Sequence, residues 1–259
     1  MKKKLGFSLS GGGARGIAHA GFLQAMEENG IKPDVISGCS MGAVVGGCYA
    51  AGVNVKTLKN ALVKLTQKDL LDFNLNLLKS RSVFSGKKME ALLRKYLGNK
   101  EIESLTPVFG CIAADLITGK TVDITDGDLV SSITASAAIP MIFKPVERNG
   151  KLLIDGGTIL RNPLKLCKTL GADVIIGVDV IGKLPEVERL DGLLDIGMRT
   201  FSVIDGLFCG KIGLKYANLM IYPKMKNVSL FKFDNLKDAY DAGYKAGLDG
   251  VEKIKALIK

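Results

Sequence analysis

One serine stands in a pattern that is typical of an enzymatic nucleophile. Ser40 is the central residue of GCSMG at residues 38–42, which fits G-x-S-x-G. A short apolar run precedes this segment and a small-residue helix is predicted after it, which is the context the pattern needs. Gly38 and Gly42 leave room for a sharp turn, and the helix N-terminus directs partial positive charge at the reacting oxygen. The same residues also fit a tight turn in which Ser40 only caps the helix.

A glycine-rich segment lies ahead of this serine. Residues 11–16 read GGGARG, after a predicted strand and at the start of a predicted helix, with Gly16 as the last residue of the motif. Consecutive glycines let backbone N–H groups converge on one point, and each donor to an oxyanion is worth roughly 3–4 kcal/mol. Arg15 adds positive charge there, unless it forms an ordinary salt bridge. The segment predicts an oxyanion hole formed by Gly11, Gly12, Gly13 and Arg15.

The same glycine segment has an alternative interpretation. It also fits G-x-G-x-x-G, which is typical of dinucleotide binding. That function requires an acidic residue at the end of the second strand, about 20 residues further on, to bind a ribose. The second predicted strand ends at residues 37–40, and Asp34 lies at its beginning. A nucleotide-binding enzyme that uses the loop at 11–16 therefore lacks its confirming residue.

The proton of the serine needs an acceptor other than histidine. The only histidine, His19, precedes the serine, so a Ser-Asp-His order along the chain is impossible, and we expect His19 to have a structural, hydrogen-bonded role. Asp155 ends a predicted strand, and Gly156 and Gly157 leave it open to a neighbouring loop. In an apolar site the pKa of a carboxylate rises from about 3.9, and it can then activate a nearby hydroxyl. An Asp-Gly-Gly turn without catalytic role is the alternative.

Composition narrows the classes of partner. Lys and Arg number 36 against 26 Asp and Glu, which gives a net charge of +10. Such a surface attracts anionic membranes or other acidic ligands, or is simply rich in solvated lysine. The basic residues are scattered and tryptophan is absent, so nucleic-acid binding is disfavoured. The five cysteines have no zinc-ligand spacing and the apolar run at residues 5–9 is too short for a signal peptide, which favours a cytoplasmic protein with reduced thiols.

Predicted strands and helices alternate along the chain. Strands are expected at residues 5–9, 34–37, 108–116, 120–124, 146–148, 151–154, 173–180 and 219–222, and the strongest helices at 87–97 and 235–258. This alternation predicts a three-layer α/β/α sandwich with a largely parallel central sheet. Residues 34–56 carry no charge between their ends, but their glycines favour close packing over a membrane span. Residues 68–85 form either a membrane-contacting cap or ordinary core.

Together these segments resemble the patatin-like phospholipase family. The resemblance rests on residues 11–16 with the following His19, on 38–42, on 155–157, on 135–140 (ASAAIP) and on the Gly243-Tyr244 pair. It implies one α/β/α domain over residues 1–259, a catalytic dyad of Ser40 and Asp155, and an oxyanion hole formed chiefly by Gly12 and Gly13. The family hydrolyses acyl esters of glycerolipids without a metal or other cofactor. The resemblance implies a lipid or other acyl-ester as substrate, and the charge of +10 would suit peripheral contact with an anionic membrane. A catalytically silent lipid-binding module is the alternative.

Overall fold

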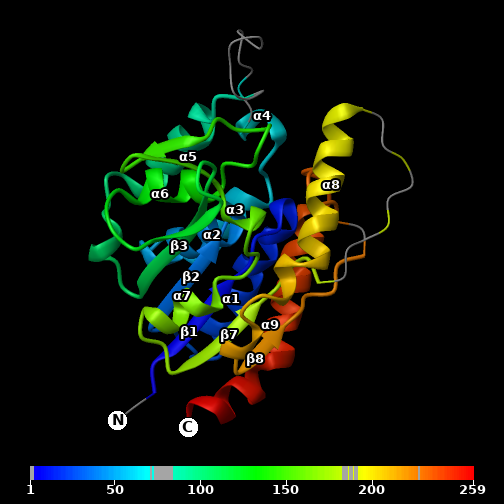
Figure 1. Cartoon of the computed structure of the whole chain (residues 1–259). Coiled ribbons are helices and arrows are strands. Elements are labelled where there is room, and N and C mark those ends of the chain that lie inside the picture. The colour runs from blue at the N-terminus through cyan, green and yellow to red at the C-terminus, as the bar shows by residue number, and fades with distance from the viewer. Residues whose placement is uncertain are drawn as a thin grey trace.

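A central sheet divides the molecule into two helical layers (Figure 1). The computed structural model describes residues 3–70, 72, 84–182, 186, 189, 192–226 and 228–259. The strands are β1 (Leu5–Leu9), β2 (Val35–Cys39), β3 (Val108–Asp115), β4 (Lys120–Ile124), β5 (Val146–Arg148), β6 (Lys151–Asp155), β7 (Val174–Val178) and β8 (Leu219–Ile221). The α-helices are α1 (Ala18–Glu28), α2 (Met41–Ala50), α3 (Val55–Leu62), α4 (Gln67–Leu70), α5 (Lys87–Leu97), α6 (Leu129–Ser136), α7 (Leu164–Thr169), α8 (Leu193–Leu207) and α9 (Leu236–Ile258).

The sheet is parallel in its centre and antiparallel at one edge. Its order is β5-β6-β3-β2-β1-β7-β8, and β4 pairs with β3 outside this path. Strands β3, β2, β1, β7 and β8 run parallel, whereas β4 and β6 pair antiparallel with β3, and β5 pairs antiparallel with β6. The expected layered α/β fold with a largely parallel sheet is thereby confirmed. The antiparallel edge matters because β6 delivers Asp155 next to the carboxyl end of β3.

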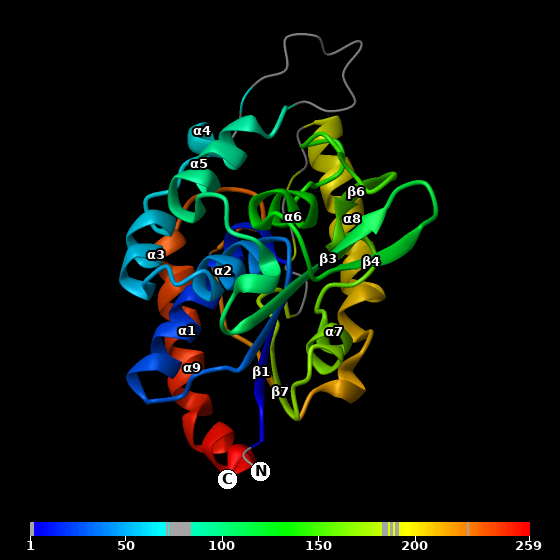
Figure 2. The same ribbon diagram turned by 90° about the vertical axis from the view of Figure 1, so that its left-hand side faces the viewer.

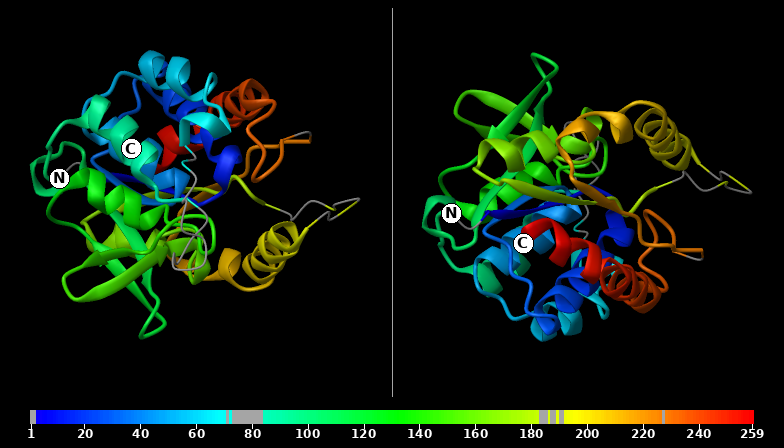
Figure 3. Two further views of the ribbon diagram at one scale, coloured as in Figure 1. Left: turned by 90° about the horizontal axis from the view of Figure 1, so that it is seen from above. Right: turned by 90° about the horizontal axis from the view of Figure 1, so that it is seen from below.

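The two faces of β1 show which helices cover the sheet. Phe7 packs edge-to-face on Phe22 of α1, with ring centroids 5.1 Å apart, on the side that also carries α2 and α9. A Cβ atom on Gly6, which faces the other way, would lie 2.4 Å from the sulfur of Cys167 in α7. Figures 2 and 3 show α7 and α8 on that second face. The alternation of side chains along a strand therefore builds both layers from one short segment.

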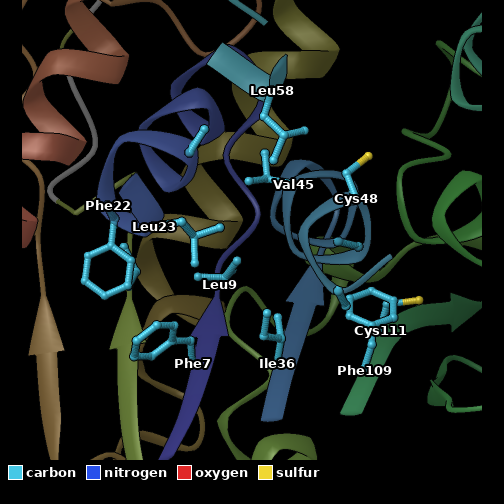
Figure 4. Close-up of a cluster of buried hydrophobic side chains, with 14 of the residues drawn as sticks. Phe7, Leu9, Phe22, Leu23, Ile36, Val45, Cys48, Leu58, Phe109 and Cys111 are labelled. Carbon is cyan, nitrogen blue, oxygen red and sulfur yellow. The ribbon is translucent and has the colours of Figure 1, made fainter. Parts of the chain in front are cut away.

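The main core lies between the sheet and α1, α2 and α3. Figure 4 shows its fully or almost fully buried side chains: Phe7, Leu9, Phe22, Leu23, Ile36, Val45, Cys48, Leu58, Phe109 and Cys111. These residues come from the central strands and the helices that follow them. The core therefore holds β1 and β2 in place. The glycine loop and the GCSMG turn follow directly at the carboxyl ends of these two strands.

Helices α1 and α9 approach each other closely at glycines. A Cβ atom on Gly243 would lie 1.8 Å from the carbonyl oxygen of Ala18, and one on Gly21 would lie 2.0 Å from that of Tyr240. Any larger residue at these positions would push the helices apart. The packing explains why Gly243, already noted in the sequence, stands beside the helix that carries His19.

The uncharged stretch at residues 34–56 forms β2, the turn after it and α2, all within the central core. None of the helices in the described part of the chain combines the length and the apolar character that a membrane span requires. Most of the segment 68–85, for which either a membrane-contacting cap or ordinary core was predicted, lies outside the described residues.

Candidate active site

Ser40 occupies a strained turn between β2 and α2. Its backbone φ is +51° and its ψ is −123°, a conformation that L-residues other than glycine rarely adopt. A Cβ atom on Gly38 would lie 2.6 Å from the Cα atom of Ala43, and one on Gly42 would lie 2.3 Å from the carbonyl oxygen of Leu9. Both glycines of the motif are therefore required by close backbone contact, and the turn sets Ser40 directly before the N-terminus of α2.

Asp155 meets this turn from the end of β6. It lies opposite Ala113 of β3, and a Cβ atom on the following Gly156 would come within 2.6 Å of the carbonyl oxygen of Ile112. Oδ1 of Asp155 accepts the N–H of Gly157 at 2.8 Å and the thiol of Cys39 at 3.9 Å. The structure thus brings the two predicted dyad residues together although they are far apart in the sequence.

The electrostatics of Asp155 suit a general base. Burial raises the pKa of its carboxyl to about 6, against hydrogen bonds from Ser40 and Gly157 that lower it, and the charge of Asp205 raises it further. At neutral pH the group is mostly ionised, yet it is a stronger base than an exposed aspartate. Burial also raises the pKa of the adjacent Cys39 thiol, so the cysteine remains protonated and donates to Asp155.

The segment at residues 135–140 links the two candidates. The hydroxyl of Ser136 accepts the backbone N–H of Ser40 at 3.1 Å and donates to the carbonyl of Ile112 at 2.7 Å. Two residues later the carbonyl of Ala138 accepts the backbone N–H of Asp155 at 2.9 Å. This segment was noticed in the sequence only as a resemblance. The structure gives it a positioning role, since it fixes both backbones relative to each other.

The glycine loop corrects one sequence prediction. Gly11 was predicted to be an oxyanion donor, but its N–H donates to the carbonyl of Arg161 at 2.9 Å and is therefore occupied. No acceptor for the N–H groups of Gly12 and Gly13 exists among the described residues. Gly13 has a φ of +51°, and a Cβ atom there would lie 2.1 Å from the carbonyl oxygen of Leu230. Within the described part of the chain, Gly12 and Gly13 are thus the loop residues whose N–H groups have no acceptor, while Gly11 anchors the loop.

Arg15 borders the same pocket as Ser40 but is bonded elsewhere. Its Nε donates to the carbonyl of Val228 at 2.8 Å, and its Nη1 donates to that of Ile181 at 3.3 Å. Burial lowers the pKa of its guanidinium, and its side chain is almost completely enclosed. Through these bonds Arg15 connects the backbone at Val228 with the backbone at Ile181. Its direct donation to an oxyanion stays a prediction.

His19 has the structural role predicted for it. Its Nε2 lies 2.9 Å from the carbonyl oxygen of Ser10, which can only accept, so this nitrogen carries the proton. Burial lowers the pKa of the ring to about 4, and the imidazole is therefore neutral at pH 7. The hydrogen bond holds the end of β1, where the glycine loop begins. His19 is bonded to this backbone and not to Ser40 or Asp155.

A buried arginine behind the site was missed by sequence reasoning. Arg161 donates through Nε and Nη2 to Asp205 of α8, with the shortest contact at 2.6 Å, and through Nη1 to Asp179 at 3.0 Å. Its carbonyl is the acceptor for Gly11. One residue therefore connects the glycine loop, the end of β7 and α8. The signal available in the sequence was only an arginine soon after the Asp-Gly-Gly motif.

A large pocket opens beside Ser40. It has a volume of about 1200 Å³ and is bordered near the serine by Gly13, Arg15 and Met41. Further along, apolar side chains of α2, α3 and α5 line it, and Met198 and Ser202 of α8 form part of another wall. Strand ends, a helix N-terminus and free backbone donors thus converge at one end of a mainly apolar cavity. Such an arrangement fits an ester that carries a long hydrocarbon chain.

Comparison with known proteins identifies the family of the chain. The family model of patatin-like phospholipases matches residues 7–168, more than half of the chain, and the chain therefore belongs to this family. An NTE family protein of Mycobacterium tuberculosis is 36% identical over 179 residues, which cover 69% of this chain and 49% of the relative. The lysophospholipase nte1 of Neurospora crassa is 34% identical over 281 residues, 98% of this chain and 18% of the relative. The chain thus spans about half or less of these relatives.

Solved structures confirm the fold. VipD from Legionella pneumophila superposes with a TM-score of 0.57 at 15% identity, covering 97% of this chain and 67% of that protein. The type III effector ExoU superposes with a TM-score of 0.51 at 15% identity, covering 97% of this chain and 53% of the effector. At this identity the likeness concerns the architecture alone.

Proposed function

We propose that the protein is a serine acyl hydrolase that cleaves lipid esters with a dyad of Ser40 and Asp155. The observation that carries this proposal is a buried carboxylate of raised pKa, with no cation beside it among the described residues, next to a serine that is held in a strained turn and lines an apolar pocket. A lysophospholipid or phospholipid is the substrate class that the pocket and the lysophospholipase relatives favour.

The reaction proceeds in two steps through an acyl-enzyme. Asp155 accepts the hydroxyl proton of Ser40 as Oγ attacks the ester carbonyl, and the N–H groups of Gly12 and Gly13 stabilise the oxyanion. The tetrahedral intermediate then collapses. The leaving alcohol, or lysolipid, takes the proton from Asp155, and the acyl group stays on Ser40. Water attacks next, its proton passes to Asp155, and the fatty acid leaves as Ser40 regains its proton.

The two alternatives have weaker support. The nucleotide-binding interpretation needs an acidic residue at the carboxyl end of β2, but Asp34 lies at the other end, where its side chain accepts the N–H of Leu5 at 2.8 Å. A silent lipid-binding module would have no need for the strained Ser40, or for a buried Asp155 that has no cation beside it in the described part of the chain, because both features cost stability.

The proposal is tested by ester hydrolysis with a serine variant. We expect the wild-type protein to release p-nitrophenol from a short-chain ester and fatty acid from a lysophospholipid, and Ser40→Ala to lower kcat/KM by at least about 10³-fold. Ser132→Ala is the matched control, since this buried hydroxyl donates to the carbonyl of Asp128, the residue directly before α6. Turnover by folded Ser40→Ala at the wild-type rate would disprove the assignment.

A further inference from the structure

Large apolar side chains are exposed along the outer side of α8. They recur at helical spacing, and their exposed fractions lie between 37 and 64%: Ile196, Val203, Ile204, Leu207 and Phe208. A helix that packs on a domain with one face normally presents polar residues on the other. We call these five residues the α8 outer face. Contiguous apolar surface of this kind marks a binding surface more often than a solvated one.

The inner side of the same helix is already occupied. Asp205 bonds Arg161, and Met198 and Ser202 are buried along the wall of the catalytic pocket. The α8 outer face therefore belongs to a helix that is fixed in place, not to one that could turn its apolar residues inward. Figures 1 and 3 show α8 on the outside of the molecule, with its outer side away from the sheet.

The exposed charges at the C-terminal end of this face have one sign. Of the two acidic residues of α8, Asp195 lies near the N-terminal end and borders the pocket, and Asp205 is buried and paired with Arg161. The exposed charged side chains that directly follow α8 are those of Lys211 and Lys215. Apolar side chains next to lysines are the combination with which a helix binds an anionic lipid surface. A symmetric contact between two copies would instead bring the like charges of two such faces together.

We infer that the α8 outer face, with Lys211 and Lys215, docks the protein on an anionic lipid surface. The apolar side chains enter the boundary between headgroups and acyl chains, and the lysines contact the headgroups. Met198 and Ser202 on the inner side of the same helix border the pocket, so docking through α8 brings a helix of the pocket wall to the lipid surface. The statement that the substrate comes from this lipid surface rests on the proposed function, whereas the docking of α8 does not depend on it.

Vesicle sedimentation with the Ser40→Ala protein tests docking apart from catalysis. We expect binding to phosphatidylcholine vesicles that contain phosphatidylglycerol, much weaker binding to phosphatidylcholine alone, and a decrease with added salt. The double variant Leu207→Asp/Phe208→Asp should weaken binding at least about tenfold. Lys211→Glu/Lys215→Glu should remove the preference for the anionic vesicles. The matched control Leu116→Asp/Ile117→Asp changes two exposed apolar residues of the β3–β4 hairpin and should bind as the parent does.

Two results would overturn the inference. One is unchanged vesicle binding by a folded Leu207→Asp/Phe208→Asp protein, with folding checked by its thermal transition. The other is a dimer in analytical ultracentrifugation that this double variant dissociates, because α8 would then be a subunit interface. When Leu207→Asp/Phe208→Asp is introduced into the protein that retains Ser40, its rate of hydrolysis of a short-chain soluble ester should equal that of wild type. Absence of that hydrolysis in wild type would count against the proposed function and leave the vesicle result intact.

Discussion

Asp155 is buried to the same degree as the neighbouring pair of Asp179 and Asp205, each being 3 or 4% exposed. The pair shares the guanidinium of Arg161, which is itself 3% exposed. Asp155 has no cation among the described residues and is bonded by the N–H of Gly157 and the thiol of Cys39.

The difference separates a structural use of buried charge from a chemical one. A carboxylate paired with a cation serves to fix segments, here the glycine loop, β7 and α8. Burial raises the pKa of Asp205 too, but its hydrogen bonds and ion pair with Arg161 oppose that rise. A carboxylate left with neutral donors keeps a raised pKa and can accept a proton from a neighbouring hydroxyl. The two regions lie side by side, since the charge of Asp205 contributes to the raised pKa of Asp155.

The largest effect on stability is expected in the paired region. Arg161→Met leaves two buried carboxylates without a cation, so the free energy of unfolding should fall by roughly 3–5 kcal/mol. Arg148→Met is the matched control, because the carboxylate partner of Arg148, Asp126, is exposed, and it should cost less than about 1 kcal/mol. Urea denaturation followed by circular dichroism measures both. Equal losses in the two variants would show that the Arg161 cluster is not a buried anchor.

A smaller effect is expected in the glycine loop, where two neighbouring positions differ. Gly13→Ala introduces strain at a positive φ and a clash with the carbonyl of Leu230, so kcat/KM should fall at least about tenfold, with a stability loss of roughly 1–3 kcal/mol. Gly11→Ala meets only ordinary contacts of 3.5 Å and keeps its N–H bond to Arg161, so it should be nearly silent. If kcat/KM for ester hydrolysis fell more in Gly11→Ala than in Gly13→Ala, the assignment of donors would be wrong.

The smallest effect, with opposite sign, is expected at Asp155. The pKa of its carboxyl in the folded protein is about 6 and exceeds the ordinary value of 3.8, so ionisation of Asp155 destabilises the folded state. This destabilisation grows from about pH 4 and reaches its full size above pH 6. Asp155→Asn should therefore be more stable than wild type by roughly 1–3 kcal/mol at pH 7, and the difference should vanish towards pH 4. Asp205→Asn, which removes a partner of Arg161, should instead be less stable. Urea denaturation as a function of pH measures both, and a destabilised Asp155→Asn at pH 7 would contradict the comparison.

Much of the fold followed from local patterns in the sequence. The helix predicted at residues 87–97 and the strands predicted at 5–9 and 120–124 have the observed bounds, because apolar spacing and glycine stops specify them locally. The hairpin at residues 146–155 follows from its Asn-Gly turn, in which both residues have positive φ. The antiparallel pairing of β6 with β3 could not be predicted, because the sequence of neither strand specifies which other strand it pairs with.

The site was predicted as far as its chemistry is local. Ser40 and the glycines around it are defined by a turn of five residues, and their backbone strain is a local property. The occupied N–H of Gly11 depends on a carbonyl 150 residues away in the sequence, so a prediction from consecutive glycines alone was bound to miss it. The pairing of Arg161 with Asp205 likewise spans 44 residues and is set by the placement of α8.

Covalent labelling of Ser40 tests the central claim, a serine activated by Asp155 without histidine, most directly. The measurement is the rate of reaction with a fluorophosphonate probe, with the modified residue located by peptide mass spectrometry. We expect labelling of Ser40 in wild type and in His19→Asn, and a loss of at least about 10³-fold in Asp155→Asn. Wild-type labelling of folded Asp155→Asn, or lost labelling in folded His19→Asn, would contradict the account.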